Sequence, residues 1–288
     1  TDFTGKIKGN LYWKAGYHFS HFKTGAFEGE NYTLPTTLYE VYKNRGIIPK
    51  EQADGGISSA IRVGLMYDSR DFEAAPSKGI WAEANFAYAP EFLGTSVGYT
   101  KYNLTFRNYL PIAKDKLVFA YRLNLQGFIG KESPAFYVLP YDTYLGPGYD
   151  REGFGGYRTV RGLMRGRIQG AHTCYFNTEL RWRFVSFQLW KQNIAFALSG
   201  FFDGARVLKG FDLSALEPVI YDAPQNPNET QFYFRYLSGK KERFHLSAGG
   251  GLRFIMNRNF IVAFEYGKAF DAQDNSKGAF YINTGFLF

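Results

Sequence analysis

The sequence predicts an all-β fold, a transmembrane antiparallel β-barrel of about ten strands within a range of eight to twelve. Three features of the 288 residues favour this fold: apolar and polar residues alternate over long stretches, aromatic residues reach 19%, and short connectors alternate with long ones. The stretches lack the i, i+3, i+4, i+7 spacing of an amphipathic helix. No run approaches the roughly 18 apolar residues of a membrane-spanning helix, which excludes a helical membrane protein.

Composition excludes several other classes. Hydrophobic residues make up 45% of the chain, so it is not intrinsically disordered. The single Cys174 cannot form an internal disulfide, and the Cys and His spacing contains no zinc pattern, so neither a metal site nor another cofactor is expected. The net charge of +8 comes from Lys and Arg scattered along the chain, and we therefore expect no nucleic-acid partner.

The expected strands follow from period-two alternation. Along 117–125, for example, every odd position is a large apolar or aromatic residue. Many of the strands reach the length, about nine to eleven residues, that a tilted strand needs to cross a bilayer. The ten expected strands cover residues 5–23, 57–68, 80–91, 97–110, 117–131, 171–186, 193–207, 243–256, 259–270 and 279–288.

The connectors are of two kinds, which is typical of outer-membrane barrels. Three long connectors cover 24–56, 132–170 and 208–242. An even number of strands would place both termini on the side of the short connectors, the periplasmic side. The short connectors cover 68–79, 110–116, 186–192 and 256–259.

The two faces of the strands are expected to suit a bilayer. In the first strand, Leu11 and Trp13 share one face while Lys14 lies on the other. We expect the apolar face to meet lipid and the charged face to line the lumen, where the charges pair. A soluble β-barrel or sandwich, with the apolar face inward, is the alternative. The large apolar residues of the last strand, expected to face outward, are Phe280, Ile282, Phe286 and Phe288.

Several motifs, in order along the chain, resemble those of one family. They are Gly64–Asp71 with Pro76–Gly79, Thr159–Leu163, Phe201–Ala205, Gly249–Phe254 and Phe264–Phe270. From about residue 57 onward the chain is similar to the BamA/TamA family of outer-membrane barrels, the bacterial surface antigen family.

The resemblance implies a location in the outer membrane of a Gram-negative bacterium. The family's barrel has sixteen strands, of which this chain matches the later ten, and family members usually carry periplasmic POTRA domains. We expect residues 1–288 to form a single barrel domain without a POTRA domain. A short family member is favoured over the tail of a longer protein, because two open sheet edges would leave backbone groups unpaired in lipid.

The resemblance also implies that the loop at about 132–170 folds into the lumen. The loop motif is then Val160, Arg161, Gly162 and Leu163, with Leu163 standing where the family prefers an aromatic residue. Phe286 and Phe288 fit the family's terminal targeting signal, although Asn283 departs from it.

Arg161 carries the main structural expectation. If the loop enters the lumen, its guanidinium group presents five donors that are costly to leave unpaired. Alternation along the strands points Glu179 and Asp203 into the same space, so we expect these carboxylates to pair with Arg161. In the alternative, the loop stays in solvent and the carboxylates pair with strand arginines: Arg181, Arg183 or Arg253.

No motif indicates an enzyme: the chain has no Gly-x-Ser-x-Gly elbow, phosphate-binding loop or His-Glu-x-x-His sequence. The resemblance implies outer-membrane biogenesis, that is, insertion or translocation of proteins or lipids through a weak seam between the first and last strands. The expected partners are outer-membrane lipids, unfolded outer-membrane proteins and other outer-membrane components. The alternative is a non-catalytic small pore, or a structural barrel that binds partners.

Overall fold

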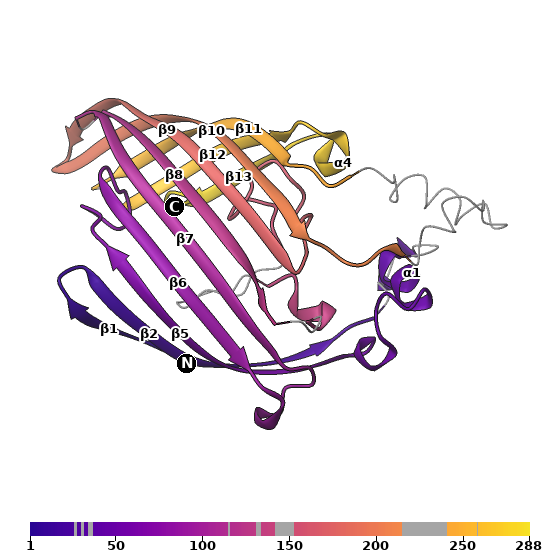
Figure 1. Cartoon of the computed structure of the whole chain (residues 1–288). Helices are drawn as coiled ribbons and strands as arrows, with labels where there is room; N and C mark the ends of the chain where they lie inside the picture. Colours follow the sequence, from indigo (N-terminus) through magenta and orange to yellow (C-terminus); the bar gives the residue numbers. More distant parts are fainter. Residues whose placement is uncertain are drawn as a thin grey trace.

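The fold is one curled antiparallel sheet of eleven strands in a computed structural model that describes residues 1–25, 28–29, 32–33, 37–114, 116–130, 134–141, 153–214, 241–257 and 259–288. Each strand pairs with the next one along the sheet (Figure 1). In sheet order the strands are β1 (Asp2–Lys8), β2 (Leu11–Lys23), β5 (Gly55–Asp68), β6 (Gly79–Ala89), β7 (Tyr99–Ala113), β8 (Leu117–Ile129), β9 (His172–Leu189), β10 (Gln192–Lys209), β11 (His245–Met256), β12 (Phe260–Ala269) and β13 (Ala279–Thr284).

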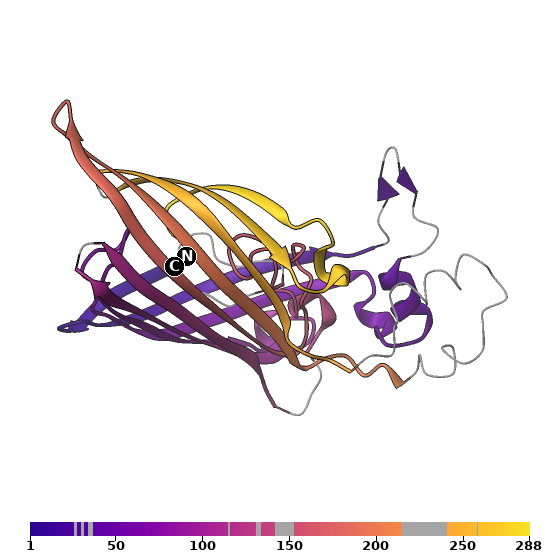
Figure 2. The ribbon, with the colours of Figure 1, turned by 90° about the horizontal axis from the view of Figure 1, so that it is seen from above.

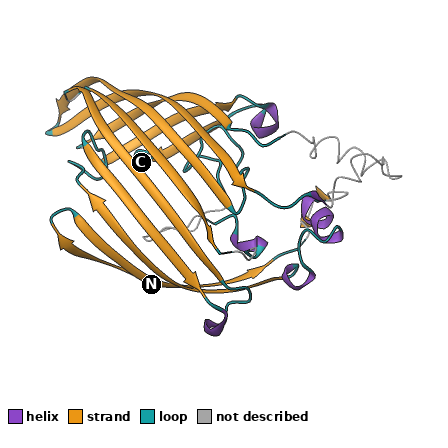
Figure 3. Ribbon diagram, in the orientation of Figure 1, coloured by secondary structure: helices purple, strands orange, loops and turns teal. Residues whose placement is uncertain are grey.

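The remaining elements are short and gather near one end of the sheet, as Figure 3 shows. Helix α1 begins with a capping box, in which Thr37 and Glu40 satisfy each other's backbone N–H groups. No helix in the described ranges is long and apolar enough to cross a membrane. These elements are the two-stranded pair β3 (Glu28–Gly29) and β4 (Tyr32–Thr33), the helices α1 (Leu38–Asn44) and α4 (Ala272–Asn275), and the 3₁₀ turns η1 (Lys50–Gln52), η2 (Glu91–Leu93) and η3 (Phe136–Val138).

Eleven strands fall within the expected range of eight to twelve, but the first expected strand was wrong. The segment 5–23 is not one strand; it is divided between β1 and β2. Lys8 pairs with Leu11, and Gly9 has a φ of +57°, so Gly9 and Asn10 form a two-residue hairpin turn. An odd number of strands does not place the amino and carboxyl termini at the same end of the sheet. The amino group of Thr1 donates to the carbonyl oxygen of Tyr17, midway along β2.

The other expected strands are confirmed to within a few residues, and so is the alternation of connectors. Parts of the three long connectors, 24–56, 132–170 and 208–242, lie outside the described residues. The short turns all lie at one end of the sheet: 9–10, 69–78, 114–116, 190–191 and 257–259.

The orientation of the two faces is confirmed. Leu123 in the middle of β8 is 50% exposed on the outer face, whereas Arg253 on β11 is fully buried on the inner one. Ion pairs fill the interior, and one of them joins Lys14 Nζ to Glu83 Oε1 at 2.6 Å. An apolar exterior around a charged interior is the arrangement that a bilayer requires of a barrel.

The sheet does not close. Its edge strands are β1 and β13, and no ladder joins them in the part of the chain that the structure describes. Figure 1 shows the sheet curling so that β1 and β2 lie on one side and β10 to β13 on the opposite side. The expected contact between the first and last strands is therefore absent between β1 and β13.

The end of the chain departs from the predicted last strand. Phe280 and Ile282 face outward as expected, at 63% and 65% exposure, but β13 stops at Thr284. Gly285 has a φ of +95°, which interrupts the pleat, and Phe288 turns into the lumen, where it is 4% exposed. The expectation that Phe286 and Phe288 face outward was wrong. In the lumen, the ring centroids of Phe286 and Phe288 lie 4.2 and 5.1 Å from Cζ of Arg181.

We expect Leu123→Arg to lower the free energy of unfolding in phospholipid vesicles by about 2–4 kcal/mol, because Leu123 lies midway along a lipid-facing strand. Ile112→Arg, next to a short turn, is the control and should cost about 0–1 kcal/mol. Denaturant titration measures both values. Equal small costs at the two positions would show that Leu123 does not face lipid.

Candidate functional site

The candidate site is formed by residues 153–171, which follow β8 and turn back into the curled sheet (Figure 2). The two arms of this inward loop are joined by Phe154 and Ile168, whose backbones exchange two hydrogen bonds of 2.9 Å. The loop therefore enters the lumen as a closed hairpin.

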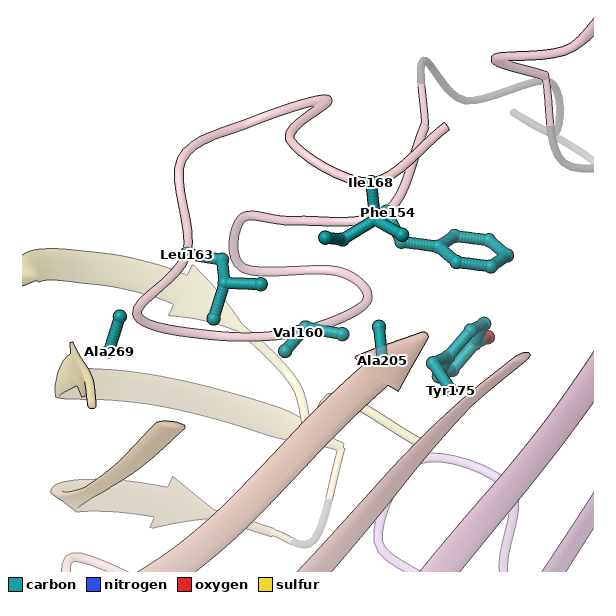
Figure 4. Packing of buried hydrophobic residues seen from close by; sticks show 7 residues of the cluster. All are labelled: Phe154, Val160, Leu163, Ile168, Tyr175, Ala205 and Ala269. Carbon is teal, nitrogen blue, oxygen red and sulfur yellow. The ribbon is translucent and has the colours of Figure 1, made fainter. Parts of the chain in front are cut away.

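A small apolar cluster seats the inward loop against the wall (Figure 4). The ring of Phe154 packs edge-on against Tyr175 of β9, with 4.7 Å between the centroids. Val160 and Leu163, the two apolar residues of the predicted motif, are buried in this cluster. Its members are Phe154, Val160, Leu163 and Ile168 from the loop, and Tyr175, Ala205 and Ala269 from β9, β10 and β12.

Arg161 is fully buried and donates to three carboxylates. Its Nε and Nη2 donate to the two oxygens of Asp203 at 2.9 and 3.1 Å, a bidentate pair. Nη1 donates to Glu179 Oε2 at 2.7 Å and to Glu265 Oε1 at 2.9 Å. The guanidinium plane also lies 3.6 Å from the centroid of Phe201. Every nitrogen of the group thus has an acceptor.

Two strand arginines complete the cluster. Arg181 Nε donates to Glu179 Oε1 at 3.0 Å. Arg253 Nη2 lies 3.0 Å from that same oxygen and 2.7 Å from Glu265 Oε1. Three buried arginines therefore face three buried carboxylates, and the formal charges cancel. The six members of this arginine cluster are Arg161, Arg181, Arg253, Glu179, Asp203 and Glu265.

The tip of the loop depends on glycine. Gly162 has a φ of +89°, and a Cβ there would lie 2.9 Å from the backbone nitrogen of Lys268 on β12. Its N–H donates to the hydroxyl of Tyr281 on β13 at 2.9 Å. Next to it, the hydroxyl of Ser247 donates to the carbonyl oxygen of Arg161. The tip is thus held close to the last strands by backbone contacts.

A second anchor lies farther along the loop. Asp274, on α4, accepts from Arg167 Nε at 3.0 Å and contacts His245 Nδ1 at 2.8 Å. The backbone carbonyl of Asp274 accepts from Met164 N–H at 3.1 Å. The inward loop is therefore tied to the connector between β12 and β13 as well as to the wall.

The structure brings together Arg161, Glu179 and Asp203 inside the sheet. Glu179 also contacts Arg181 and Arg253, two of the partners considered for a loop that stays in solvent. Sequence reasoning did not assign Glu265, Arg253 or Phe201 to Arg161. Their inward positions in the alternation of β10, β11 and β12 were the available signal. Searching the described residues finds no group of His, Cys, Asp and Glu that could hold a metal ion.

Comparison with known proteins identifies the family, since residues 2–288 match the Omp85 superfamily domain. The chain belongs to the Omp85 superfamily. Its fold is similar to the crystal structure of BamA from Haemophilus ducreyi lacking POTRA domains 1-3, with a TM-score of 0.61 and 18% sequence identity. That match covers 99% of this chain and 53% of the BamA chain, so the chain spans about half the length of its structural neighbour. No curated protein matches the sequence.

Family and fold together indicate an outer-membrane β-barrel. The resemblance to the BamA/TamA family that the motifs predicted is confirmed.

Gly162→Ala should release the inward loop, because the new methyl group would collide with backbone that cannot move aside. Gly156→Ala is the matched control: its φ is +84°, but the nearest atom to its Cβ is 3.8 Å away. Both variants carry a similar backbone strain, on the order of 1 kcal/mol. Limited proteolysis of residues 154–168 in detergent should show faster cleavage for Gly162→Ala only. Equal cleavage of the two variants would mean that close packing at the tip does not hold the loop.

Proposed function

We propose that the chain acts in outer-membrane biogenesis, assisting the insertion or translocation of proteins or lipids at the gap between β1 and β13. The observation that carries this proposal is the pair of edge strands that share no ladder. In lipid, each unpaired backbone group costs several kcal/mol, so a free edge favours pairing with an incoming strand. Edge strands as short as β1 and β13, with seven and six residues, keep that cost low when no substrate is bound.

The inward loop has a part in this proposal. Its tip bonds to Tyr281 on β13, and the arginine cluster holds the loop against β9, β10 and β12. The Tyr157 ring on the loop also lies 6.5 Å from the Tyr281 ring. The loop then steadies the last strands from inside, while the outer edge of β13 stays available to a partner strand.

The location and partners follow from the same proposal. The chain forms a single barrel domain, 1–288, in the bacterial outer membrane, with the short turns and the end of the chain on the periplasmic side. β1 starts beside Tyr17, midway along the wall, and runs toward the short turns, so its amino terminus does not reach the periplasmic end in the described structure. Its partners are outer-membrane lipids, unfolded outer-membrane proteins and other outer-membrane components, and it acts without catalysis.

The alternative, a small pore, fits less well. Two further segments besides the inward loop occupy the interior: Phe286–Phe288, and the β5–β6 turn, where Phe72 and Ala75 pack against β10 to β12. Deleting 153–168 and measuring conductance in a planar bilayer tests this alternative. A large rise in conductance would favour a pore that the loop closes.

A disulfide lock tests the gap directly. In a Cys174→Ser background, cysteines at Phe3 or Ile7 on β1 are combined with one at Phe280 on β13, all of them outward-facing residues. Because β1 and β13 share no ladder, a direct disulfide cannot join them, and oxidation instead links the two cysteines through a flexible dithiol spacer with a disulfide at each end. The measurement is the rate at which an unfolded eight-stranded outer-membrane protein inserts into phosphatidylcholine vesicles that contain the purified chain. We expect oxidation to slow insertion to the rate of empty vesicles and reductant to restore it.

The matched control places cysteines at Phe106 and Leu123, which face each other across the intact β7–β8 ladder. Oxidising this pair should leave the insertion rate unchanged. The proposal fails if the locked gap inserts protein as fast as the control, or if the unlocked chain never exceeds empty vesicles.

A further inference from the structure

A cavity of about 240 Å³ lies inside the sheet at the end that carries the short turns. The β5–β6 turn forms one wall with Pro76 and Ser77. The other walls come from β8, β9, β10 and β11, and the ring of Phe286 also lines the space. The cavity is separate from the inward loop, which approaches the lumen from the end of the long connectors.

Three cationic side chains line this cavity: Lys116, Arg181 and Arg183. No Asp or Glu is among its lining residues within the part of the chain that the structure describes. The N–H of Arg183 donates to the carbonyl oxygen of Lys116 at 2.7 Å, so the backbones of these two residues are adjacent. Across the described ranges, neither the Lys116 nor the Arg183 side chain forms an ion pair. Lys116 and Arg183 therefore bring positive charge to this cavity without a carboxylate partner among the described residues.

Arg181 adds a buried donor. Arg181 is 5% exposed; its Nε donates to Glu179, and its Nη2 donates to a main-chain oxygen of Phe288, the last residue, at 2.8 Å. Nη1 is buried and has no acceptor among the described residues. A buried donor of a charged group is costly to leave unpaired. Because Arg181 belongs to the charge-balanced arginine cluster, it brings to the cavity a free N–H donor and no net charge.

The wall formed by the β5–β6 turn is preorganised. Asp71 accepts from the N–H and hydroxyl groups of Ser77 at 2.8 and 2.6 Å and from the N–H of Lys78 at 3.2 Å. Burial alone would raise the pKa of Asp71, but these hydrogen bonds lower it below its ordinary value. The Asp71 carboxylate is thus engaged in shaping the turn.

We propose that this cavity binds a phosphate group. Near neutral pH, inorganic phosphate carries between one and two negative charges and the phosphodiester of a lipid headgroup carries one, which suits Lys116 and Arg183 together with the free donor of Arg181. Guanidinium groups match phosphate oxygens in a two-point geometry, and two of the three cations are arginines. The phosphate is either free in solution or part of a lipid headgroup. This site does not depend on the gap between β1 and β13, so it stands or falls independently of the proposed function.

The test titrates inorganic phosphate into the purified full-length chain in dodecyl maltoside, a phosphate-free detergent, and follows the heat of binding and the unfolding temperature. We expect one saturable site per chain and a higher unfolding temperature. Arg183→Gln and Lys116→Gln should each weaken binding by about tenfold, because each removes one of the two cations that have no carboxylate partner.

Lys114→Gln is the matched control, since Lys114 lies in the same β7–β8 turn and does not line the cavity. It should bind phosphate as the unchanged chain does. The titration of the unchanged chain is decisive even if a variant fails to fold. If the unchanged chain shows no saturable phosphate binding, the proposal is wrong. Equal weakening by Lys114→Gln also overturns it.

A second arm identifies the source of the phosphate. The titration is repeated in nanodiscs of phosphatidylglycerol. Unchanged affinity for inorganic phosphate supports a site for the free anion. If inorganic phosphate binds more weakly in the nanodiscs than in dodecyl maltoside, the result supports a site that the lipid headgroup already fills.

Discussion

The bilayer forces the ionic side chains of this sheet into its interior, and the structure depends on how they are paired there. Arg161 is the centre of that pairing, with Asp203, Glu179 and Glu265 around it. A buried ion pair is weak evidence for stability, but removing one member leaves an uncompensated charge that costs about 3–5 kcal/mol. The arginine cluster therefore favours this position of the loop, because withdrawing Arg161 would leave Asp203 without its bidentate partner and would remove one cation from Glu179 and Glu265. The apolar cluster around Phe154 and Leu163 also packs the loop against the wall of the sheet.

Much of this arrangement could be predicted from alternation alone. A period of two gives each strand residue a face, so Glu179 and Asp203 could be pointed at Arg161 before the structure was known. Alternation does not fix which carboxylates meet, since that depends on the register between strands, and Glu265 was therefore not assigned to Arg161. Alternation also misleads where a glycine breaks the pleat. Gly9 and Gly285 adopt positive φ angles, which divided the first strand and turned Phe286 and Phe288 inward. The open edge was not predictable either, because pairing between strands distant in sequence leaves no local signal.

The interior is obstructed at both ends, by different means. The inward loop enters from the end of the long connectors and is tied down again at Asp274. At the other end, the β5–β6 turn and Phe286 surround a cavity in which Lys116 and Arg183 have no carboxylate partner among the residues the structure describes. The free edges of β1 and β13 are where this sheet differs from a closed barrel.

The central claim is that the pairing of Arg161 with Asp203 holds the loop in the lumen. A double-mutant cycle with Arg161→Met and Asp203→Leu measures it most directly, with hydrogen exchange of the amides of 154–168 as the readout in lipid. The account predicts that the effects of the two substitutions on the free energy of exchange are strongly non-additive, with a coupling of about 0.5–3 kcal/mol. The reason is that either substitution alone leaves the other residue buried without its ion-pair partner. Additive losses of protection, within about 0.3–0.5 kcal/mol, would contradict it.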